Sequence, residues 1–313
     1  MNRVFGIDVG GTSIKIGLFE EGGELVATEE VPTGALLTED DFVKVTGALG
    51  RVLEQNGAAP EEVCAIGLDI PGPVDAEGRV GMLPNIQLDD KGLRAAIQDS
   101  FGAARLAFVN DANAAALGEL WQGAARGVGS AVLVALGTGV GAGVIVDGRV
   151  VAGAFGAAGE IGHLTVNRSE TRVCGCGRCG CLEQYASATG VVRMYRERCE
   201  AAGATPVPLT GPTDTLSVFR AAEHGNEVAA DAIFSMADYL GYALAQVSCV
   251  VDPEVYLIGG GVGKGFGFFG ERLRSAFRHY CLATSAGTRI VQASLGNAAA
   301  MYGCAYQALL ARY

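Results

Sequence analysis

The chain has 313 residues, of which 50% are hydrophobic and 18% charged, a composition typical of a compact soluble protein and not of a disordered one. Its formal net charge of −11 argues against a nucleic-acid partner and against an anionic membrane surface, so a small substrate is the better expectation. The long uncharged run over residues 129–146 is interrupted by glycines and Thr138, which indicates two buried strands around a turn, not a membrane span. The length allows two domains.

The N-terminal segment predicts a meander of strands followed by a helix. Short apolar strands are expected over residues 4–7 and 13–19, separated by the turn Asp8–Thr12, and a third strand follows a Glu-Gly-Gly turn. Thr38 has the position of an N-cap before three acidic residues, and apolar residues at helical spacing continue until Asn56-Gly57.

Two further strands should each end at a polar or proline-rich loop. The strand over residues 63–70 ends at Pro71-Gly72-Pro73, which cannot continue a ladder. The strand over residues 106–109 ends at Asn110-Asp111, and Asp111 is placed to begin an alanine-rich helix that runs to about Gln122. From these residues alone, the ordinary interpretation of Asp111 is a helix N-cap.

From Ser130 the opening arrangement repeats as a strand, the turn 137–141, a second strand and an Asp-Gly turn. Glycine lets backbone N–H groups approach phosphate oxygens closely, and Thr12 and Thr138 add hydroxyl donors. Two copies of such a unit, one per domain, predict a polyphosphate clamp. Asp8 has the position of a carboxylate that holds Mg²⁺ through water, and its alternative role is a turn-capping aspartate.

A cluster of soft metal ligands lies in the middle of the chain. A tight glycine-containing turn can aim three thiolates at one ion, and a histidine completes a tetrahedron; the ligands are His163, Cys174, Cys176 and Cys181. Four protein ligands leave no position for a reacting water, so we expect structural Zn²⁺ that holds the neighbouring Glu160 and Glu183 in place. Cys179 is a surplus thiol, either a competing ligand or a small buried residue.

The alternative for these cysteines is a disulfide or a set of free thiols. The chain opens without a basic and then apolar leader, so a reducing, cytoplasmic compartment is expected, where cysteines favour metal over disulfides. The remaining cysteines stand in apolar stretches and are interpreted as core residues: Cys64, Cys199, Cys249, Cys281 and Cys304.

Near the C-terminus, a strand over residues 255–258 leads into the glycine turn 259–263. A final apolar helix follows residues 295–298, with Met301 and Ala305 among the residues along one side. We expect this helix to return and pack on the first domain, so that the two domains are interleaved.

Five of these motifs together resemble the ROK family of sugar kinases and sugar-responsive repressors: 8–17, 110–113, 136–141, 159–163 and the cysteine segment 174–183. The resemblance extends over essentially the whole chain. It implies an α/β, actin-like ATPase (ribonuclease H-like) fold with two α/β domains and an interdomain cleft. The N-terminal domain would be 1–109, completed by the C-terminal helix at about 299–313, and the C-terminal domain with the zinc-binding loop would be 110–298.

By that resemblance, Asp111 is the general base that takes a proton from a sugar hydroxyl as it attacks the γ-phosphate of Mg²⁺-ATP. A carboxylate at a helix N-terminus is expected to stay ionised at neutral pH. The resemblance also assigns the sugar contacts, which are Gly72, Asn85, Asn110, Asp111, Glu160, His163 and Glu183. It assigns the nucleotide and phosphate contacts as Asp8, Gly10, Gly11, Thr12, Lys15, Gly137, Thr138, Gly139, Gly260 and Gly261. In the family, His163 serves as a zinc ligand while lying against the sugar.

Glucose, converted to glucose 6-phosphate in glycolysis, is the first expectation because the set of sugar contacts is complete. Many glucokinases of the family have a tryptophan after the sugar-binding Asn85, whereas the only Trp here is Trp121, so N-acetylmannosamine, fructose, mannose and allose stay open. Polyphosphate is the alternative donor. Family repressors carry an N-terminal helix-turn-helix segment before a core that here begins by residue 4, so a repressor is not expected; a non-catalytic sugar sensor is the remaining alternative. The family resemblance favours a homodimer or homotetramer.

Overall fold

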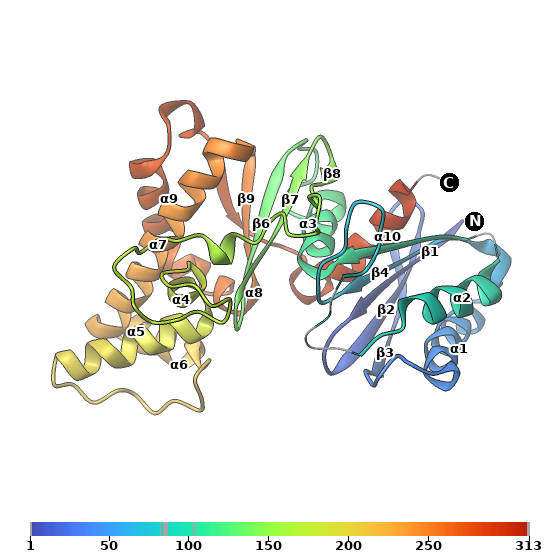
Figure 1. Ribbon diagram of the computed structural model, residues 1–313, viewed down its shortest axis with the longest axis horizontal. Coiled ribbons are helices and arrows are strands. Elements are labelled where there is room, and N and C mark those ends of the chain that lie inside the picture. Colours follow the sequence, from blue (N-terminus) through green and yellow to red (C-terminus); the bar gives the residue numbers. More distant parts are fainter. Residues whose placement is uncertain (1, 82, 84–86, 103, 312–313) are drawn as a thin grey trace. The chain divides into compact units, whose positions relative to one another are not determined.

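The computed structural model describes residues 2–81, 83, 87–102 and 104–311. The chain forms two compact units (Figure 1). Unit 1 comprises residues 1–127, 143–158 and 294–313, and unit 2 comprises residues 128–142 and 159–293. The chain therefore leaves and re-enters unit 1 more than once. The expected division at residues 110 and 299 stays a prediction.

Unit 1 is built on a five-stranded sheet in the order β3-β2-β1-β4-β5. Its strands are β1 (Arg3–Val9), β2 (Ser13–Glu20), β3 (Leu25–Pro32), β4 (Val63–Ile70) and β5 (Arg105–Asn110). β1 is antiparallel to β2 and parallel to β4, which is parallel to β5. The predicted meander and the two later strands are confirmed. The carboxyl ends of β1, β4 and β5 therefore meet at one edge of the sheet.

Helices cover both faces of this sheet. α1 (Glu39–Gln55) and α2 (Asp90–Phe101) contribute to the larger apolar core, and the 3-10 turn η1 (Pro60–Glu62) lies beside α2. The predicted cap of α1 is confirmed, because Thr38 and Asp41 form a capping box. On the other face, α3 (Asp111–Gln122) packs on α10 (Ala299–Leu310), which follows the 3-10 turn η4 (Gly296–Ala298).

The C-terminal helix returns to the first sheet, as predicted. α10 contacts β1, β4 and β5, and Met301 and Ala305 pack against Val4 in a small apolar cluster. A side chain at Gly6 would collide with the backbone of Met301, so glycine permits this close approach. Residues nearly 300 positions apart thus form one core.

The second sheet has the order β10-β9-β6-β7-β8. Its strands are β6 (Ala131–Leu136), β7 (Val140–Val146), β8 (Arg149–Val150), β9 (Val255–Gly259) and β10 (Arg289–Gln292). β6, β9 and β10 are parallel, and the boundary between the units falls within β7. The Asp147-Gly148 turn is confirmed, and both residues have positive φ, as a type I′ hairpin turn requires.

The helices of unit 2 are α4 (Glu183–Ala186), α5 (Ala188–Ala201), α6 (Thr215–Glu223), α7 (Glu227–Val251), α8 (Gly260–Gly263) and α9 (Phe266–Tyr280), with 3-10 turns η2 (Ile161–His163) and η3 (Ala283–Ser285). The long helix α7 packs against α5, α6 and α9. Within the described ranges, no helix has the length and apolar character needed to cross a membrane.

The prediction that the scattered cysteines lie in the core is only partly right. Cys199 and Cys304 are buried, but Cys64 and Cys281 are half-buried and Cys249 is exposed. Cys249 lies in the last turns of α7, where the adjacent Val250 is also exposed. Apolar neighbours in the sequence therefore do not show that a residue is buried.

Candidate active site

Asn110, the last residue of β5, organises the start of α3. Its Oδ1 accepts the N–H groups of Ala112 at 3.0 Å and Asn113 at 3.1 Å, and its Nδ2 donates to the Gly72 carbonyl at 3.0 Å. Its backbone is extended, so Asn110 is the N-cap and Asp111 is the first helical residue. The N-cap role considered for Asp111 is therefore wrong. Asn110 therefore supplies the cap, while the Asp111 carboxylate stands at the first position of the helix.

The Asp111 carboxyl group is held by local donors at the solvent-exposed start of α3. Its Oδ1 accepts from Asn110 Nδ2 and from the Ala112 N–H, both at 2.9 Å. Although the residue reaches solvent, the protein atoms around the carboxyl group disfavour its charge, and this burial raises the pKa above the ordinary 3.8. The hydrogen bond from the Ala112 N–H lowers the pKa of Asp111, whereas the negative charge of Asp8 raises it. Asp111 is thus more basic than the helix N-terminus alone predicts.

Asp8, at the end of β1, faces Lys15 across the hairpin. The strand register pairs the two residues, and Lys15 Nζ lies 3.0 Å from Asp8 Oδ2. The following turn is fixed by the Gly10 N–H, which donates to the Ser13 carbonyl at 3.0 Å, while Gly11 and Thr12 are exposed. The turn therefore offers an open glycine and a hydroxyl beside an ion pair.

Asp69 is a third carboxyl group near this turn, and it is not among the residues predicted from the sequence motifs. It lies near the carboxyl end of β4 and is fully buried, with Oδ1 accepting the Val9 N–H at 2.9 Å and Oδ2 lying 3.5 Å from Cys304 Sγ. Burial, and then the negative charge of Asp8, raises its pKa well above 3.8. The signal was available, since Asp69 is an acid within an otherwise apolar strand.

In unit 2, the two glycine turns lie side by side. They follow β6 and β9, which are parallel neighbours, and a side chain at Gly260 would collide with the backbone of Leu136. Gly260 also has a φ of +80°, so this position requires glycine on two counts. The Gly137 carbonyl accepts the Ala188 N–H at 2.8 Å, and the Thr138 carbonyl accepts the Thr189 hydroxyl at 2.8 Å.

The predicted metal ligands come together in unit 2. One ligand atom from each of His163, Cys174, Cys176 and Cys181 lies within 4.8 Å of every other. The Cys176 and Cys181 sulfurs are 3.6 Å apart, and Cys174 Sγ is 3.9 Å from His163 Nδ1. These separations match the edges of a zinc-sized tetrahedron with Zn–S bonds of about 2.3 Å. All nine cysteines are free thiols in this structure.

Two glutamates flank this cluster in different ways. His163 turns Nδ1 to the cysteines and Nε2 to Glu160, whose Oε2 is 3.9 Å away and whose side chain is 58% exposed. Glu183 has one oxygen 3.8 Å from Cys174 Sγ and the other 3.1 Å from the Val140 N–H. Glu183 therefore connects the cysteine cluster to the end of the Gly137–Gly139 turn.

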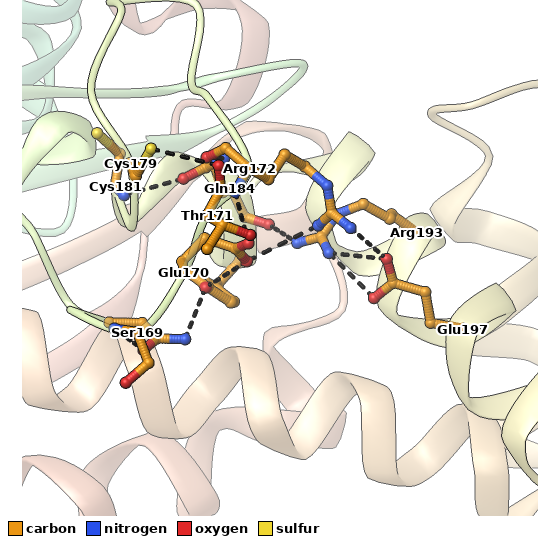
Figure 2. A network of polar contacts seen from close by, with 11 residues as sticks. Ser169, Glu170, Thr171, Arg172, Cys179, Cys181, Gln184, Arg193 and Glu197 are labelled. Carbon is orange, nitrogen blue, oxygen red and sulfur yellow. Dashed lines mark hydrogen bonds and ion pairs between the residues drawn. The ribbon is translucent and has the colours of Figure 1, made fainter.

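The outer part of the cysteine loop is held by a separate polar network (Figure 2). Gln184 accepts the Cys181 N–H at 3.1 Å and donates to the Arg172 carbonyl at 2.9 Å. The Arg172 and Arg193 guanidinium groups share the Glu197 carboxylate, at 2.8 Å and 3.0 Å. Cys179 is not part of the cluster, since its sulfur lies 3.5 Å from the Thr171 carbonyl.

The predicted site residues thus form one group within each unit. Unit 1 gathers Asp8, Gly10, Gly11, Thr12, Lys15, Gly72, Asn110 and Asp111. Unit 2 gathers Gly137, Thr138, Gly139, Glu160, His163, Glu183, Gly260, Gly261 and the three cysteines. Asn85, the remaining predicted sugar contact, lies outside the described residues.

An α/β protein with two glycine-threonine turns, a carboxylate at a helix start and a histidine-cysteine cluster has the parts of a phosphotransferase. The family model described as "ROK family" matches residues 4–311, and the chain belongs to that family. The two mixed sheets with their covering helices have the actin-like ATPase fold of ROK kinases.

Three relatives illustrate this membership. The chain is 36% identical to a glucokinase of Halalkalibacterium halodurans, over 95% of this chain and 92% of that protein. The ROK hexokinase of Thermus thermophilus superposes with a TM-score of 0.81 at 34% identity, covering 98% of both chains. The ROK glucokinase of Streptomyces griseus, solved with glucose and AMPPNP, has a TM-score of 0.77 at 31% identity, covering 99% of this chain and 100% of that one.

Proposed function

We propose that this protein is an ATP-dependent sugar kinase that phosphorylates glucose to glucose 6-phosphate. The observation that carries the proposal is the Asp111 carboxylate, positioned by Asn110 at the start of α3 and made more basic than a free aspartate. Relatives at 30–36% identity that are named glucokinases support the acceptor, and the relative solved with glucose and AMPPNP supports the donor.

In the proposed mechanism, Asp111 accepts the proton of the attacking sugar hydroxyl. Phosphoryl transfer requires mainly positioning, neutralisation of charge and one carboxylate near the acceptor. The raised pKa of Asp111 increases its affinity for the proton of the attacking hydroxyl. Asn110 and the Ala112 N–H hold Oδ1, which leaves Oδ2 for the hydroxyl.

The nucleotide contacts are proposed on the three glycine turns. Gly10, Gly11 and Thr12 in unit 1, and Gly137, Thr138 and Gly139 in unit 2, would donate N–H and hydroxyl groups to phosphate oxygens. Gly260 and Gly261 would face the adenosine. Lys15 would add positive charge near the phosphates, and Asp8 would hold the Mg²⁺ of Mg²⁺-ATP through water.

The sugar contacts are proposed on Gly72, Asn85, Asn110, Asp111, Glu160, His163 and Glu183. Carboxylate and amide groups suit a polyol, because each sugar hydroxyl both donates and accepts a hydrogen bond. His163 would contact sugar and metal through different ring nitrogens, since Nδ1 faces the cysteines and Nε2 faces Glu160.

We further propose that His163, Cys174, Cys176 and Cys181 hold structural Zn²⁺. The donor set of three thiols and one imidazole, with the spacing measured above, supports zinc over harder ions. The ion would supply rigidity only, because four protein ligands leave no open position. The ion would affect the site by fixing Glu183, whose carboxylate accepts the Val140 N–H at the end of the phosphate turn.

Three wider expectations are also proposals. A homodimer or homotetramer, a cytoplasmic location and a place in glycolysis all rest on the family and on the proposed substrate. The division of the chain into domains 1–109 with 299–313 and 110–298 is retained as a proposal of the same kind.

The first test is ADP release from Mg²⁺-ATP with glucose, mannose, fructose, allose and N-acetylmannosamine in parallel. We expect selective turnover on glucose, and Asp111→Asn is the control for turnover by this site. Turnover on another sugar would overturn the glucose assignment alone. Turnover only with polyphosphate would overturn the assignment of ATP as the phosphate donor. Binding of glucose without turnover from either donor would indicate a sugar sensor.

A further inference from the structure

A charged pocket lies in unit 2, away from the glycine turns. It has a volume of about 320 Å³ and is formed by the C-terminal half of α9 and the segment 286–291. β10 pairs with β9 in parallel, and Arg289 pairs with Val255 at the amino end of that strand. Gly259 ends the strand at the opposite, carboxyl end, roughly 13 Å further along at 3.3 Å per residue, and Gly260 follows it. The pocket is therefore separate from the proposed nucleotide turns.

All the ionisable side chains found among the described lining residues of this pocket are arginines: Arg274, Arg278 and Arg289. Another pocket of unit 2 differs in charge, because both arginines and glutamates line it. Its charged lining residues are Arg172, Glu183, Arg193, Arg196, Glu197 and Glu200. In a chain with 34 acidic and 23 basic residues, an acid-free lining departs from the general surface. Such a lining gives a locally positive potential.

Arg274 is a fixed member of this group. Its Nε donates to the Ile290 carbonyl at 3.0 Å, its guanidinium lies 5.0 Å from the ring centre of Phe266, and its charge is shared with Glu271. Arg274 therefore shapes the wall between α9 and β10 more than it offers free hydrogen-bond donors.

Arg278 and Arg289 are the uncommitted members. Arg278 follows Arg274 by one helical turn on the same face of α9, and in the described part of the chain it has no ion pair. Arg289 is exposed and is the first residue of β10; Glu254 lies near it, but that carboxylate already accepts the N–H groups of Gly129 and Ser130. A cation at the C-terminus of α9 is favoured by the helix dipole, which explains Arg278. The dipole does not explain Arg289, which lies on β10.

The backbone that lines the same pocket includes one unpaired amide among the described residues. Thr288 uses its N–H on the Ser285 carbonyl and its hydroxyl on the Pro253 carbonyl, so it is occupied. Gly287, beside it, is exposed, and its N–H shows no acceptor among the residues described. Two arginines without an ion pair among the described residues, and an exposed glycine whose N–H has no acceptor there, thus line a pocket at the lower end of small-molecule site volumes.

We propose that this pocket is a second ligand site, which binds the phosphoryl group of inorganic phosphate or of a small phosphate ester. Planar guanidinium groups bind phosphate oxygens in pairs, and they do so better than ammonium groups. Because the whole chain carries a net charge of −11, an anion binds where positive groups converge and not over the general surface.

The test is calorimetric titration of the full-length protein with inorganic phosphate and, separately, with glycerol 3-phosphate at constant ionic strength. We expect the double variant Arg278→Gln, Arg289→Gln to weaken binding at least about tenfold, because two charge-assisted donors are lost. The phosphate affinity of Arg278→Lys should lie between those of the wild type and the double variant, since lysine keeps the charge but loses the paired donors. Arg126→Gln, which removes an exposed charge in unit 1, should change the dissociation constant by less than about twofold.

Unchanged phosphate binding in the double variant, or an equal loss in Arg126→Gln, would overturn the proposal, as would the absence of saturable binding to the wild type. Tighter binding of glycerol 3-phosphate than of phosphate would identify an ester as the ligand, and equal binding would identify the free anion. Both altered arginines are exposed, so the unfolding temperature should stay unchanged. Sugar-kinase turnover in phosphate-free buffer should also stay unchanged, which separates this site from the proposed active site.

Discussion

The two glycine-threonine turns are built alike but are held by different parts of the fold. In unit 1, the Gly10 carbonyl accepts the Thr33 hydroxyl at 2.7 Å. In unit 2, the Thr138 carbonyl accepts the Thr189 hydroxyl at 2.8 Å. Each turn is therefore tied by one threonine from a distant segment, as expected for two copies of one phosphate-binding unit.

Beside each turn, one backbone N–H donates to a carboxylate, and the two carboxylates belong to different kinds of structure. Asp69, which accepts the Val9 N–H before the first turn, is a fully buried member of the first sheet. Glu183, which accepts the Val140 N–H after the second turn, belongs to the cysteine loop. The first turn thus depends on the fold alone, whereas the second should depend on the metal that we propose for that loop. The first unit also carries the acids Asp8 and Asp111, so chemistry and metal dependence are expected in different units.

The largest effect should come from Asp111→Asn, which tests whether the chemistry lies in unit 1. The amide oxygen can still accept the Ala112 N–H, so the start of α3 and glucose binding should be kept within several-fold. Loss of a positioned base should lower kcat by about 10²–10⁴-fold. The measurement is steady-state ADP release, with glucose binding followed by calorimetry. Turnover close to that of the wild type would refute the proposed base.

The next largest effect should come from the cysteine cluster, through Cys176→Ser. We expect loss of bound zinc and a fall in turnover of about 10–100-fold, because Glu183 would no longer be held at the second turn. Cys179→Ser is the matched control, since Cys179 lies in the same loop but outside the cluster. Metal analysis and kinetics on both variants decide the point; full activity in metal-free protein would contradict the dependence.

The sequence predicted the elements and the local motifs well, because these depend on short-range patterns. The Thr38 cap, the strand over 63–70 and the grouping of the four metal ligands are each visible within a short stretch of the chain, the longest being residues 163–181. Asp69 shows what the sequence could not supply. Its partners, Val9 and Cys304, are 60 and 235 positions away, and only the register of β1, β4 and α10 brings them together.

Glu119 is a second case of the same kind. It is fully buried on α3 and accepts the N–H groups of Ala124, Ser294 and Leu295 at 2.6–2.8 Å. It therefore ties the end of α3 to the point where the chain re-enters unit 1. Periodicity places Glu119 on a helix of mostly small apolar residues, but it does not reveal donors 175 positions away.

Substitution of Asp69 should affect stability more than turnover. Asp69→Ala leaves the buried Val9 N–H without its acceptor, which should lower the free energy of unfolding by about 1–3 kcal/mol. Asp69→Asn keeps an acceptor oxygen and should rescue most of that loss. Urea denaturation of the three proteins measures this. Equal destabilisation by both variants would show that the Val9 hydrogen bond is not the important contact.

The pH dependence of Asp69→Asn sharpens this expectation. Because the pKa of Asp69 is raised in the folded protein, the folded state keeps a proton that the unfolded chain releases above about pH 4. The contribution of Asp69 to stability is therefore greatest at low pH and falls as the pH rises from 3.8 towards the folded value. The variant lacks this group, so its stability relative to the wild type should increase with pH above about 4. Parallel pH curves would contradict the raised pKa.

The smallest effects should come from the two threonines, which compare the turns directly. Thr33→Val and Thr189→Val each remove one hydroxyl while keeping the side-chain shape. The Gly10 carbonyl is half-buried and cannot fully replace its donor with water, so Thr33→Val should raise the KM for ATP by about five- to tenfold, the equivalent of one hydrogen bond. Thr138 is exposed, so water can replace the Thr189 hydroxyl, and that variant should change KM by no more than about twofold. If Thr189→Val had the larger effect, the second turn would be the more critical phosphate contact despite its exposure, and the similarity between the two turns would not extend to how they bind the nucleotide.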